Sequence, residues 1–268
     1  MKIDRQRDRF GLGKRSTPER NTILITGASA GLGEGMARQW AAKGHNLALA
    51  ARRRANLEAL RAELLAKNPA IEIGVAELDV TDPEAVREEF TRLEGELGGI
   101  DRYVLNAGLG KGASIGSGKA WANAQTAEVN VLGTLHQAEV AIELFRDRRK
   151  GGHLVFISSI ASRRGMLGAE TTYGATKAFV TALAQGIHAE QDKRNSGITV
   201  STILPGYIDT DMTTHNRSPL KAGRDKGVDA IVSAIDREPV QAAVPALPWT
   251  VVDPALRFLP EPLSRKFL

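Results

Sequence analysis

Three glycines at positions 27, 31 and 33 follow directly on the short apolar, β-branched run 21–26. Such a run is typical of a buried strand, and the following residues, 33–43, have helical character. Strand, glycine-rich turn and helix in this order are the setting of a dinucleotide site. Gly27 permits the tight turn, Gly31 lets the backbone approach a pyrophosphate, and Gly33 allows close helix packing. Because a helix N-terminus attracts phosphate, we expect a bound dinucleotide here rather than a glycine-rich turn without a ligand.

Segments typical of strands and helices alternate along the rest of the chain. We expect strands at 21–26, 46–51, 71–76, 101–105, 153–157, 198–204 and 240–244. We expect helices at 33–43, 56–67, 83–97, 173–193 and 227–237, with two more starting near 118 and 124 and ending at 148. This alternation predicts an α/β fold with a doubly wound parallel sheet of about seven strands. The domain spans residues 21–245, between a basic N-terminal arm at 1–20 and an apolar, proline-broken C-terminal extension at 246–268.

The net charge of +5 comes mainly from the N-terminal arm. Residues 1–20 hold seven basic and three acidic side chains, or +4, which leaves +1 for the remaining chain. The charge therefore does not favour nucleic-acid binding. We expect a solvated arm, with contact to an anionic lipid surface as the alternative. There is no apolar core of a signal peptide and no apolar stretch of about 20 residues, so we expect a cytoplasmic protein without a transmembrane helix.

Cysteine and histidine give no indication of a metal site. The 268 residues include no cysteine, and the five histidines show no ligand-type spacing. Thiolate sites and disulfides are therefore excluded, and we expect no bound metal.

Tyr173 and Lys177 stand four residues apart, which brings both side chains to one face of the predicted helix. A free tyrosine has a pKa of about 10. We expect the lysine ammonium, together with a cationic cofactor ring, to lower this pKa and make Tyr173 a general acid or base. A tyrosine and a lysine at this spacing on a helix are also commonly neighbours without a catalytic role. Neither of the other two tyrosines has a lysine at this spacing.

The pattern Thr26-Gly27-x-x-x-Gly31-x-Gly33 with Tyr173-x-x-x-Lys177 resembles the short-chain dehydrogenase/reductase family. The resemblance covers residues 21–245. Matching segments follow in order: Asn106-Ala107-Gly108, Asn130, Ser158-Ser159, and Pro205-Gly206 with Thr210. It implies a Rossmann-type fold, hydride transfer between a nicotinamide and a small-molecule carbonyl or secondary alcohol, and a homodimer or homotetramer.

The same resemblance implies four catalytic residues. Tyr173 exchanges the proton with the substrate oxygen, and Ser159 hydrogen-bonds that oxygen. Lys177 lowers the pKa of the tyrosine and holds the nicotinamide ribose, and Asn130 positions a water. The serine departs from the family pattern, because Ser159 lies fourteen residues before Tyr173 instead of thirteen. Ser158 and Ser162 are therefore alternatives, and any of these hydroxyls can also serve as a backbone cap.

The end of the second strand indicates NADP(H). An acidic residue there favours NAD, whereas this chain has Arg52 and Arg53, and a guanidinium binds phosphate through paired donors. Alternatively, these two arginines face solvent at the start of the next helix and bind no phosphate. Asp79 resembles the family aspartate beside the adenine ring, or caps the approach to the next helix. The predicted cofactor-binding residues are Gly27, Ser29, Ala30, Gly31, Leu32, Gly33, Arg52, Arg53, Asp79, Val80, Asn106, Ala107, Gly108, Tyr173, Lys177, Pro205, Gly206, Ile208 and Thr210.

The sequence is also compatible with other functions. A nucleotide-sensing protein without turnover and a membrane-surface protein are alternatives to the enzyme. Residues 207–226 are the expected lid, and Arg163 and Arg164 either attract an anionic substrate or face water. For the apolar segment 245–260 we expect packing across a subunit contact, ahead of covering the pocket or touching a membrane.

Overall fold

The computed structural model describes residues 19–213 and 220–250. The predictions for residues 1–18, for the middle of the lid (214–219) and for the end of the C-terminal extension (251–268) lie outside the described residues.

Seven parallel strands form one sheet in the order β3-β2-β1-β4-β5-β6-β7. They are β1 (Thr22–Thr26), β2 (Asn46–Ala51), β3 (Ile73–Glu77), β4 (Arg102–Leu105), β5 (Gly152–Ile157), β6 (Ile198–Pro205) and β7 (Gln241–Val244). The central strands β1 and β5 are rich in apolar residues and buried along their whole length, as expected for strands covered on both faces. The predicted doubly wound, Rossmann-type sheet in a single domain is confirmed.

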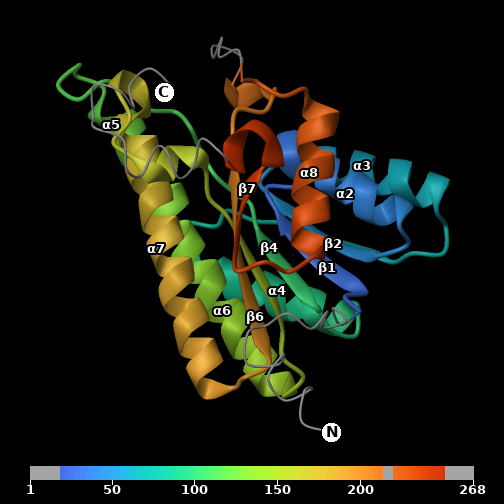
Figure 1. The fold of residues 1–268 in the computed structure, drawn as a ribbon. Helices are drawn as coiled ribbons and strands as arrows, with labels where there is room; N and C mark the ends of the chain where they lie inside the picture. The colour runs from blue at the N-terminus through green and yellow to red at the C-terminus, as the bar shows by residue number, and fades with distance from the viewer. Residues whose placement is uncertain (1–18, 214–219, 251–268) are drawn as a thin grey trace, which may run out of the picture.

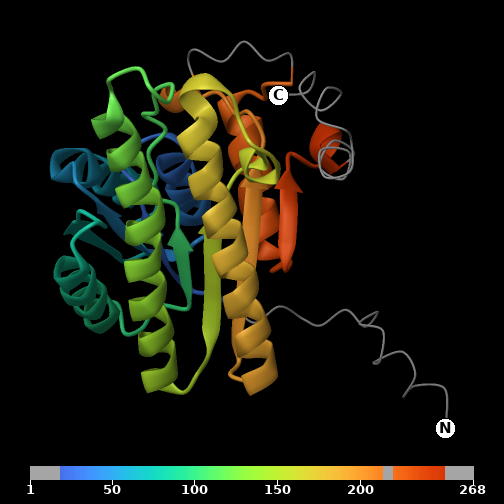
Figure 2. The same cartoon turned by 90° about the vertical axis from the view of Figure 1, so that its left-hand side faces the viewer.

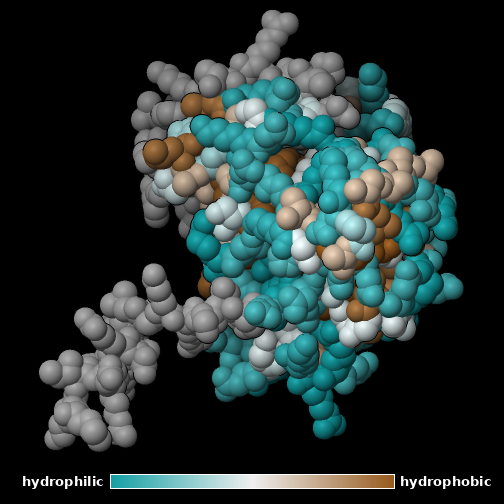
Figure 3. All heavy atoms as spheres, turned by 90° about the vertical axis from the view of Figure 1, so that its right-hand side faces the viewer, coloured by the Kyte–Doolittle hydropathy of each residue, from teal (hydrophilic) through white to brown (hydrophobic). Residues whose placement is uncertain are grey.

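Helices cover both faces of the sheet (Figure 1). On one side lie α2 (Gly31–Ala42), α3 (Arg54–Lys67) and α8 (Arg224–Asp236), and on the other α4 (Pro83–Glu96), α5 (Ala120–Ala127), α6 (Gly133–Arg148) and α7 (Thr171–Arg194). Helices α6 and α7 run side by side along the sheet (Figure 2). The opposite outer face, over α2, α3 and α8, is largely hydrophilic (Figure 3).

Most predicted boundaries agree with the structure to within three residues. The predicted cap before Pro83 is confirmed, because the Asp82 side chain accepts a hydrogen bond from Ala85 N at 3.0 Å. Helix α8 begins at Arg224 rather than at the predicted Gly227. Gly227 lies inside the helix, where the Ile208 side chain packs against it. Between α5 and α6 the chain forms a π-helical turn, Glu128–Leu132, that the periodicity did not predict.

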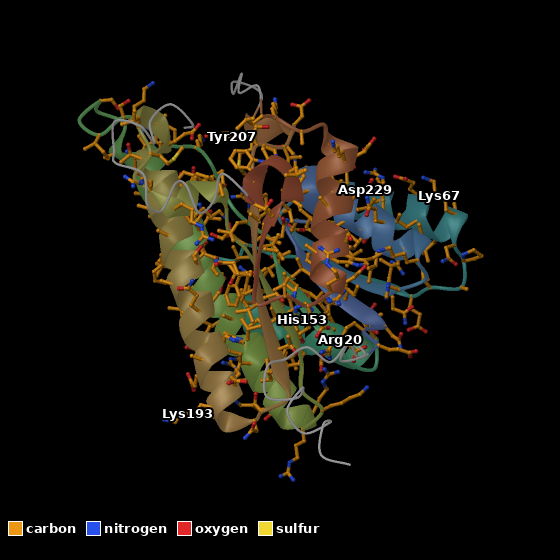
Figure 4. All side chains as sticks on the ribbon, in the orientation of Figure 1. Arg20, Lys67, His153, Lys193, Tyr207 and Asp229 are labelled. Carbon is orange, nitrogen blue, oxygen red and sulfur yellow. The ribbon has the colours of Figure 1, made fainter. Side chains whose placement is uncertain are left out.

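The amino ends of the strands are closed by a buried ionic cluster. Arg102, 3% exposed, donates to His153 Nδ1 at 2.9 Å and to Asp236 Oδ1 at 2.8 Å. Glu238 accepts from Arg20 at 2.8 Å. Burial and the Arg102 charge hold the pKa of His153 well below its usual value, so the ring is neutral. Figure 4 shows His153 and Arg20 toward the end of the molecule opposite Tyr207, which leaves the carboxyl ends of the strands for a ligand.

The glycines offer a matched test of this packing. A Cβ on Gly152 would lie 1.9 Å from Cε1 of the buried Phe145, whereas a Cβ on Gly186, within α7, would meet nothing within 4 Å. We expect Gly152→Ala to lower the free energy of unfolding in urea by about 1–3 kcal/mol. Gly186→Ala should raise it by roughly 0.5–1 kcal/mol, because alanine favours the helix. Equal effects of the two substitutions would contradict the packing described.

Candidate active site

A pocket of about 490 Å³ opens at the carboxyl ends of the strands. It is lined by the turns after β1, β2, β3, β4, β5 and β6 together with the first turns of α7. All the predicted cofactor-binding residues line it except Gly33, and of the four predicted catalytic residues Ser159, Tyr173 and Lys177 line it and Asn130 does not. Segments far apart in the sequence therefore meet in one crevice, as the predicted sheet requires.

The glycine-rich turn is shaped to receive a phosphate. Gly27 and Gly31 have φ values of +66° and +61°, which favour glycine. A Cβ on Gly33 would lie 2.4 Å from the Gly27 carbonyl oxygen, so Gly33 serves packing beneath the pocket. Helix α2 begins at Gly31 with Ala30 at its N-cap, and no side chain caps its first N–H groups. An anionic ligand at this turn therefore fits the residues present.

Hydrogen bonds between Thr26 and Asn106 join this turn to the turn after β4. The Thr26 hydroxyl accepts from the backbone N–H of Asn106 at 3.1 Å and of Ala107 at 3.0 Å. The Asn106 side-chain amide donates to the Thr26 carbonyl at 2.8 Å. Asn106 therefore holds the two turns together, and its amide is engaged in doing so. Thr26 belongs to the glycine motif but was not predicted as a site residue.

Two arginines stand beside the glycine-rich turn at the end of β2. Arg53 Nε and Nη2 donate to the Ser29 hydroxyl at 3.2 and 3.1 Å. Arg52 Nη1 lies 3.8 Å from a carboxylate oxygen of Asp79, and both of these side chains are more than 40% exposed. Arg53 thus contacts the glycine-rich turn through Ser29. Arg52 and Arg53 both line the pocket, and we call these two residues the arginine rim.

Asn130 lies in the π-helical turn and braces the chain beyond β4. Its Oδ1 accepts from Leu109 N at 2.7 Å, and its Nδ2 donates to Leu109 O at 2.9 Å and to Thr176 Oγ1 at 3.0 Å. The side chain is fully buried and has no free donor left. A Cβ on Gly108 would lie 3.3 Å from Asn130 Oδ1 and 3.4 Å from Lys177 Nζ, so these two side chains meet at this glycine.

The three candidate serines have different surroundings. Ser158 donates to Lys177 O at 2.9 Å and pairs with Thr181 Oγ1 at 2.7 Å, so it fastens β5 to α7. Ser162 does not line the pocket. Ser159 does, and its hydroxyl accepts from Ala161 N at 3.2 Å while acting to lower the pKa of Tyr173. The geometry favours Ser159 as the serine that acts with the tyrosine.

The pKa values of Tyr173 and Lys177 are both set mainly by burial. Part of the Tyr173 surface is open to the pocket, yet burial raises the pKa of its phenol to about 12 against the opposing Ser159 hydrogen bond. Burial also lowers the pKa of Lys177 to about 8. The Lys177 ammonium lies 5.8 Å from the Tyr173 ring centre and donates to the Ile157 carbonyl at 2.8 Å. Desolvation of the phenolate is therefore the largest effect on the Tyr173 pKa, and the lowering expected from Lys177 together with a cationic cofactor ring stays a prediction.

Trp249, from the C-terminal extension, packs within its own chain. It is fully buried beside Ile160 and Tyr207, with the Tyr207 ring centre 5.8 Å away. A Cβ on Gly206 would lie 2.0 Å from the indole, so the glycine is required for this contact. The predicted subunit contact is therefore wrong for Trp249. Its packing instead supports the segment after β6 that lines the pocket.

Several pocket residues were not predicted from the sequence. Most of them directly flank predicted motifs and are apolar, so no chemical signal marks them: Ala51, Leu78, Leu109, Val129, Ile157, Met212 and Thr213. Arg163 and Arg164 are half-buried and do not line the pocket. Within residues 19–213 and 220–250 there is no cluster of three or more acidic, histidine or cysteine side chains suited to a metal ion. Among the helices of these same residues, none combines the length and the apolar character of a membrane span.

Comparisons with known proteins agree with this architecture. The family model described as short chain dehydrogenase matches residues 21–221. An uncharacterized oxidoreductase of Mycobacterium tuberculosis is 48% identical over 249 residues, which cover 92% of this chain and 97% of that protein. The 3-oxoacyl-(acyl-carrier-protein) reductase MabA of the same species is 33% identical over 192 residues, 72% of this chain and 71% of the reductase. A solved short-chain dehydrogenase from Sphingobium yanoikuyae in complex with NADPH is 30% identical with a TM-score of 0.75, covering 87% of this chain and 92% of its own.

The lowered pKa of Lys177 predicts a pH-dependent stability. Between pH 8 and 10.5 the unfolded lysine holds a proton that the folded lysine has lost, so stability rises with pH in this window. From pH 8 to 10 we expect the free energy of unfolding to rise by about 2–3 kcal/mol more in the wild type than in Lys177→Met. Chemical denaturation at a series of pH values measures this difference. Parallel curves for the two proteins would show that Lys177 titrates normally.

Proposed function

The chain belongs to the short-chain dehydrogenase/reductase family, and on this basis we propose that it is an NADP(H)-dependent oxidoreductase acting on a carbonyl or secondary alcohol. A nicotinamide cofactor bound in the pocket would supply or accept the hydride. The glycine-rich turn after β1 would hold its phosphates. The observation that carries the proposal is the single pocket that unites this turn with Ser159, Tyr173 and Lys177.

Tyr173 is the proposed proton donor in the direction of carbonyl reduction. With its pKa raised to about 12, the phenol is protonated at neutral pH and can donate to the carbonyl oxygen of the substrate. Ser159, which lines the same pocket as Tyr173, would donate to the same oxygen and stabilise its developing negative charge. Lys177, buried beside Tyr173, would supply positive charge as the tyrosine loses its proton.

NADP(H) is proposed over NAD(H) on the basis of the arginine rim. No acidic residue follows β2, where a carboxylate would accept a hydrogen bond from a ribose hydroxyl. Arg53 and the Ser29 hydroxyl instead form a cluster of donors suited to a phosphate, with Arg52 beside them. The solved relative from Sphingobium yanoikuyae contains NADPH, which agrees with this choice.

We also propose a homodimer or homotetramer. Helix α7 exposes Phe179, and the adjoining π-helical turn exposes Leu132, at 36% and 47%. Exposed apolar side chains on neighbouring helices are suited to packing against another subunit.

The role of Tyr173 is tested by its phenylalanine variant. We expect Tyr173→Phe to lower kcat for ketone reduction with NADPH by about 100-fold or more, because a positioned general acid is lost. The affinity for NADPH should stay within about threefold, since the ring remains. Tyr103→Phe is the control, because Tyr103 is fully buried away from the pocket and hydrogen-bonds Glu94. A Tyr173→Phe protein that keeps its activity would contradict the assignment, and NADPH binding without turnover in the wild type would support a sensor.

The cofactor choice is tested at the rim. We expect Arg53→Ala to lower kcat/KM for NADPH by about tenfold or more and to change that for NADH by less than about twofold. Arg54→Ala is the matched control, because Arg54 is exposed, pairs with Glu58 and does not line the pocket. Equal losses with both cofactors, or equal losses in the two variants, would contradict a phosphate-binding role for Arg53.

A further inference from the structure

A second hollow, of about 430 Å³, lies beside the candidate active site. It is formed mainly by the loop at 109–119, between β4 and α5, which we call the entrance loop. Its lining residues are Lys111, Gly112, Ala113, Ser114, Ser117, Lys119, Trp121, Ala122 and Ala169. None of them lines the proposed cofactor pocket.

The entrance loop is held firmly at two points. Asn130 makes paired hydrogen bonds to the backbone N–H and carbonyl of Leu109, at 2.7 and 2.9 Å. Asn123 does the same for Ala113, at 3.0 Å for both bonds. The hollow between these points and the first turn of α5 is therefore part of the folded structure, and a ligand would meet it largely preformed.

The entrance loop begins at the reactive end of the cofactor pocket. Leu109 lines that pocket. A Cβ on Gly110 would lie 3.9 Å from Cδ2 of the Tyr173 ring and 2.9 Å from Cγ of Met212. Lys111 is the next residue, and consecutive Cα atoms are only about 3.8 Å apart. The hollow therefore begins within one residue of the contact between Gly110 and the Tyr173 ring.

The chemistry of the hollow is cationic and aromatic. Lys111 and Lys119 are its charged lining residues, both are exposed, and neither forms an ion pair with a carboxylate among the described residues. By contrast, Lys221 on the neighbouring lid is paired with Asp209. The Lys111 ammonium lies 4.8 Å from the ring centre of Trp121, which is 58% exposed. One ammonium group over an indole and a second ammonium group in the same hollow favour a ligand with an anionic end and an apolar body.

We propose that the substrate is a ketone whose apolar chain ends in a carboxylate or a similar anion, and that Lys111 and Lys119 bind this anionic end while Trp121 contacts the chain. This inference rests on the proposed carbonyl reduction at Tyr173. The lysines and the tryptophan determine substrate affinity and take no part in the proton transfer.

Matched pairs of substrates separate this inference from the proposed reaction. The probes are 6-oxoheptanoate and 9-oxodecanoate, each compared with its methyl ester, which has the same ketone and chain without the charge. We expect both esters to be reduced with NADPH, and at least one keto acid to show a KM about fivefold or more below that of its ester. The difference should shrink at high salt, because exposed charges are screened.

Variants assign the effect to the hollow. Lys111→Met and Lys119→Met should each raise KM for the preferred keto acid by about three- to fivefold and leave kcat and the KM of the ester within about twofold. Lys193→Met is the matched control. It removes the same charge near the C-terminal end of α7, where Figure 4 labels Lys193, and Lys193 does not line the hollow. Equal KM values for acid and ester, or equal effects of all three variants, would overturn the inference while leaving ketone reduction intact.

A binding measurement covers the case in which no ketone is reduced. Trp121 is exposed, whereas Trp40 and Trp249 are fully buried, so a change in tryptophan emission on adding 9-oxodecanoate reports mainly on the hollow. We expect a saturable change that is lost in Trp121→Phe and weakened in Lys111→Met. No change in emission with the wild type would overturn the anionic site. A saturable change without turnover would support the site and contradict the proposed reaction instead.

Discussion

The crevice of this protein depends on the hydrogen bonds between Thr26 and Asn106. Strands β1 and β4 are neighbours in the sheet, and the chain leaves them toward opposite edges. The Thr26 hydroxyl and the Asn106 amide join the ends of these strands, and fix the spacing of the turns that follow. Gly33 lets α2 approach this junction so closely that a Cβ would collide with Gly27. The pocket, and every proposed contact in it, is built on this junction.

Burial dominates the electrostatics of the candidate site. The same removal from water raises the pKa of the Tyr173 phenol and lowers that of the Lys177 ammonium. Both groups are therefore biased toward their neutral forms, which is the state that costs least in a site with few charged partners. A neutral phenol holds the proton that the proposed carbonyl reduction would transfer to the substrate oxygen. Lys177 and a bound cationic ligand are the proposed sources of charge that favours the phenolate.

The sequence predicted the fold well, because strand and helix periodicity is local. Strand β2 has the predicted bounds, and the glycine turn, Ser159, Tyr173 and Lys177 meet in one pocket as the parallel sheet requires. What it did not predict depends on long-range packing. The pKa of Tyr173 follows from burial that no local pattern encodes. Trp249 fills a space that exists only because Gly206 lies opposite it, and the clamp of Asn130 on Leu109 depends on an unpredicted π-helical turn.

A calorimetric titration of the purified protein with NADPH and, separately, with NADH tests directly whether the crevice binds a nicotinamide cofactor and which one it prefers. A crevice with a glycine cradle and an arginine rim predicts one site per chain, with NADPH bound at least about tenfold more tightly than NADH. Tighter binding of NADH would contradict the role assigned to Arg52 and Arg53. If neither nucleotide binds, the crevice is not a nicotinamide site and the proposed oxidoreductase function is wrong.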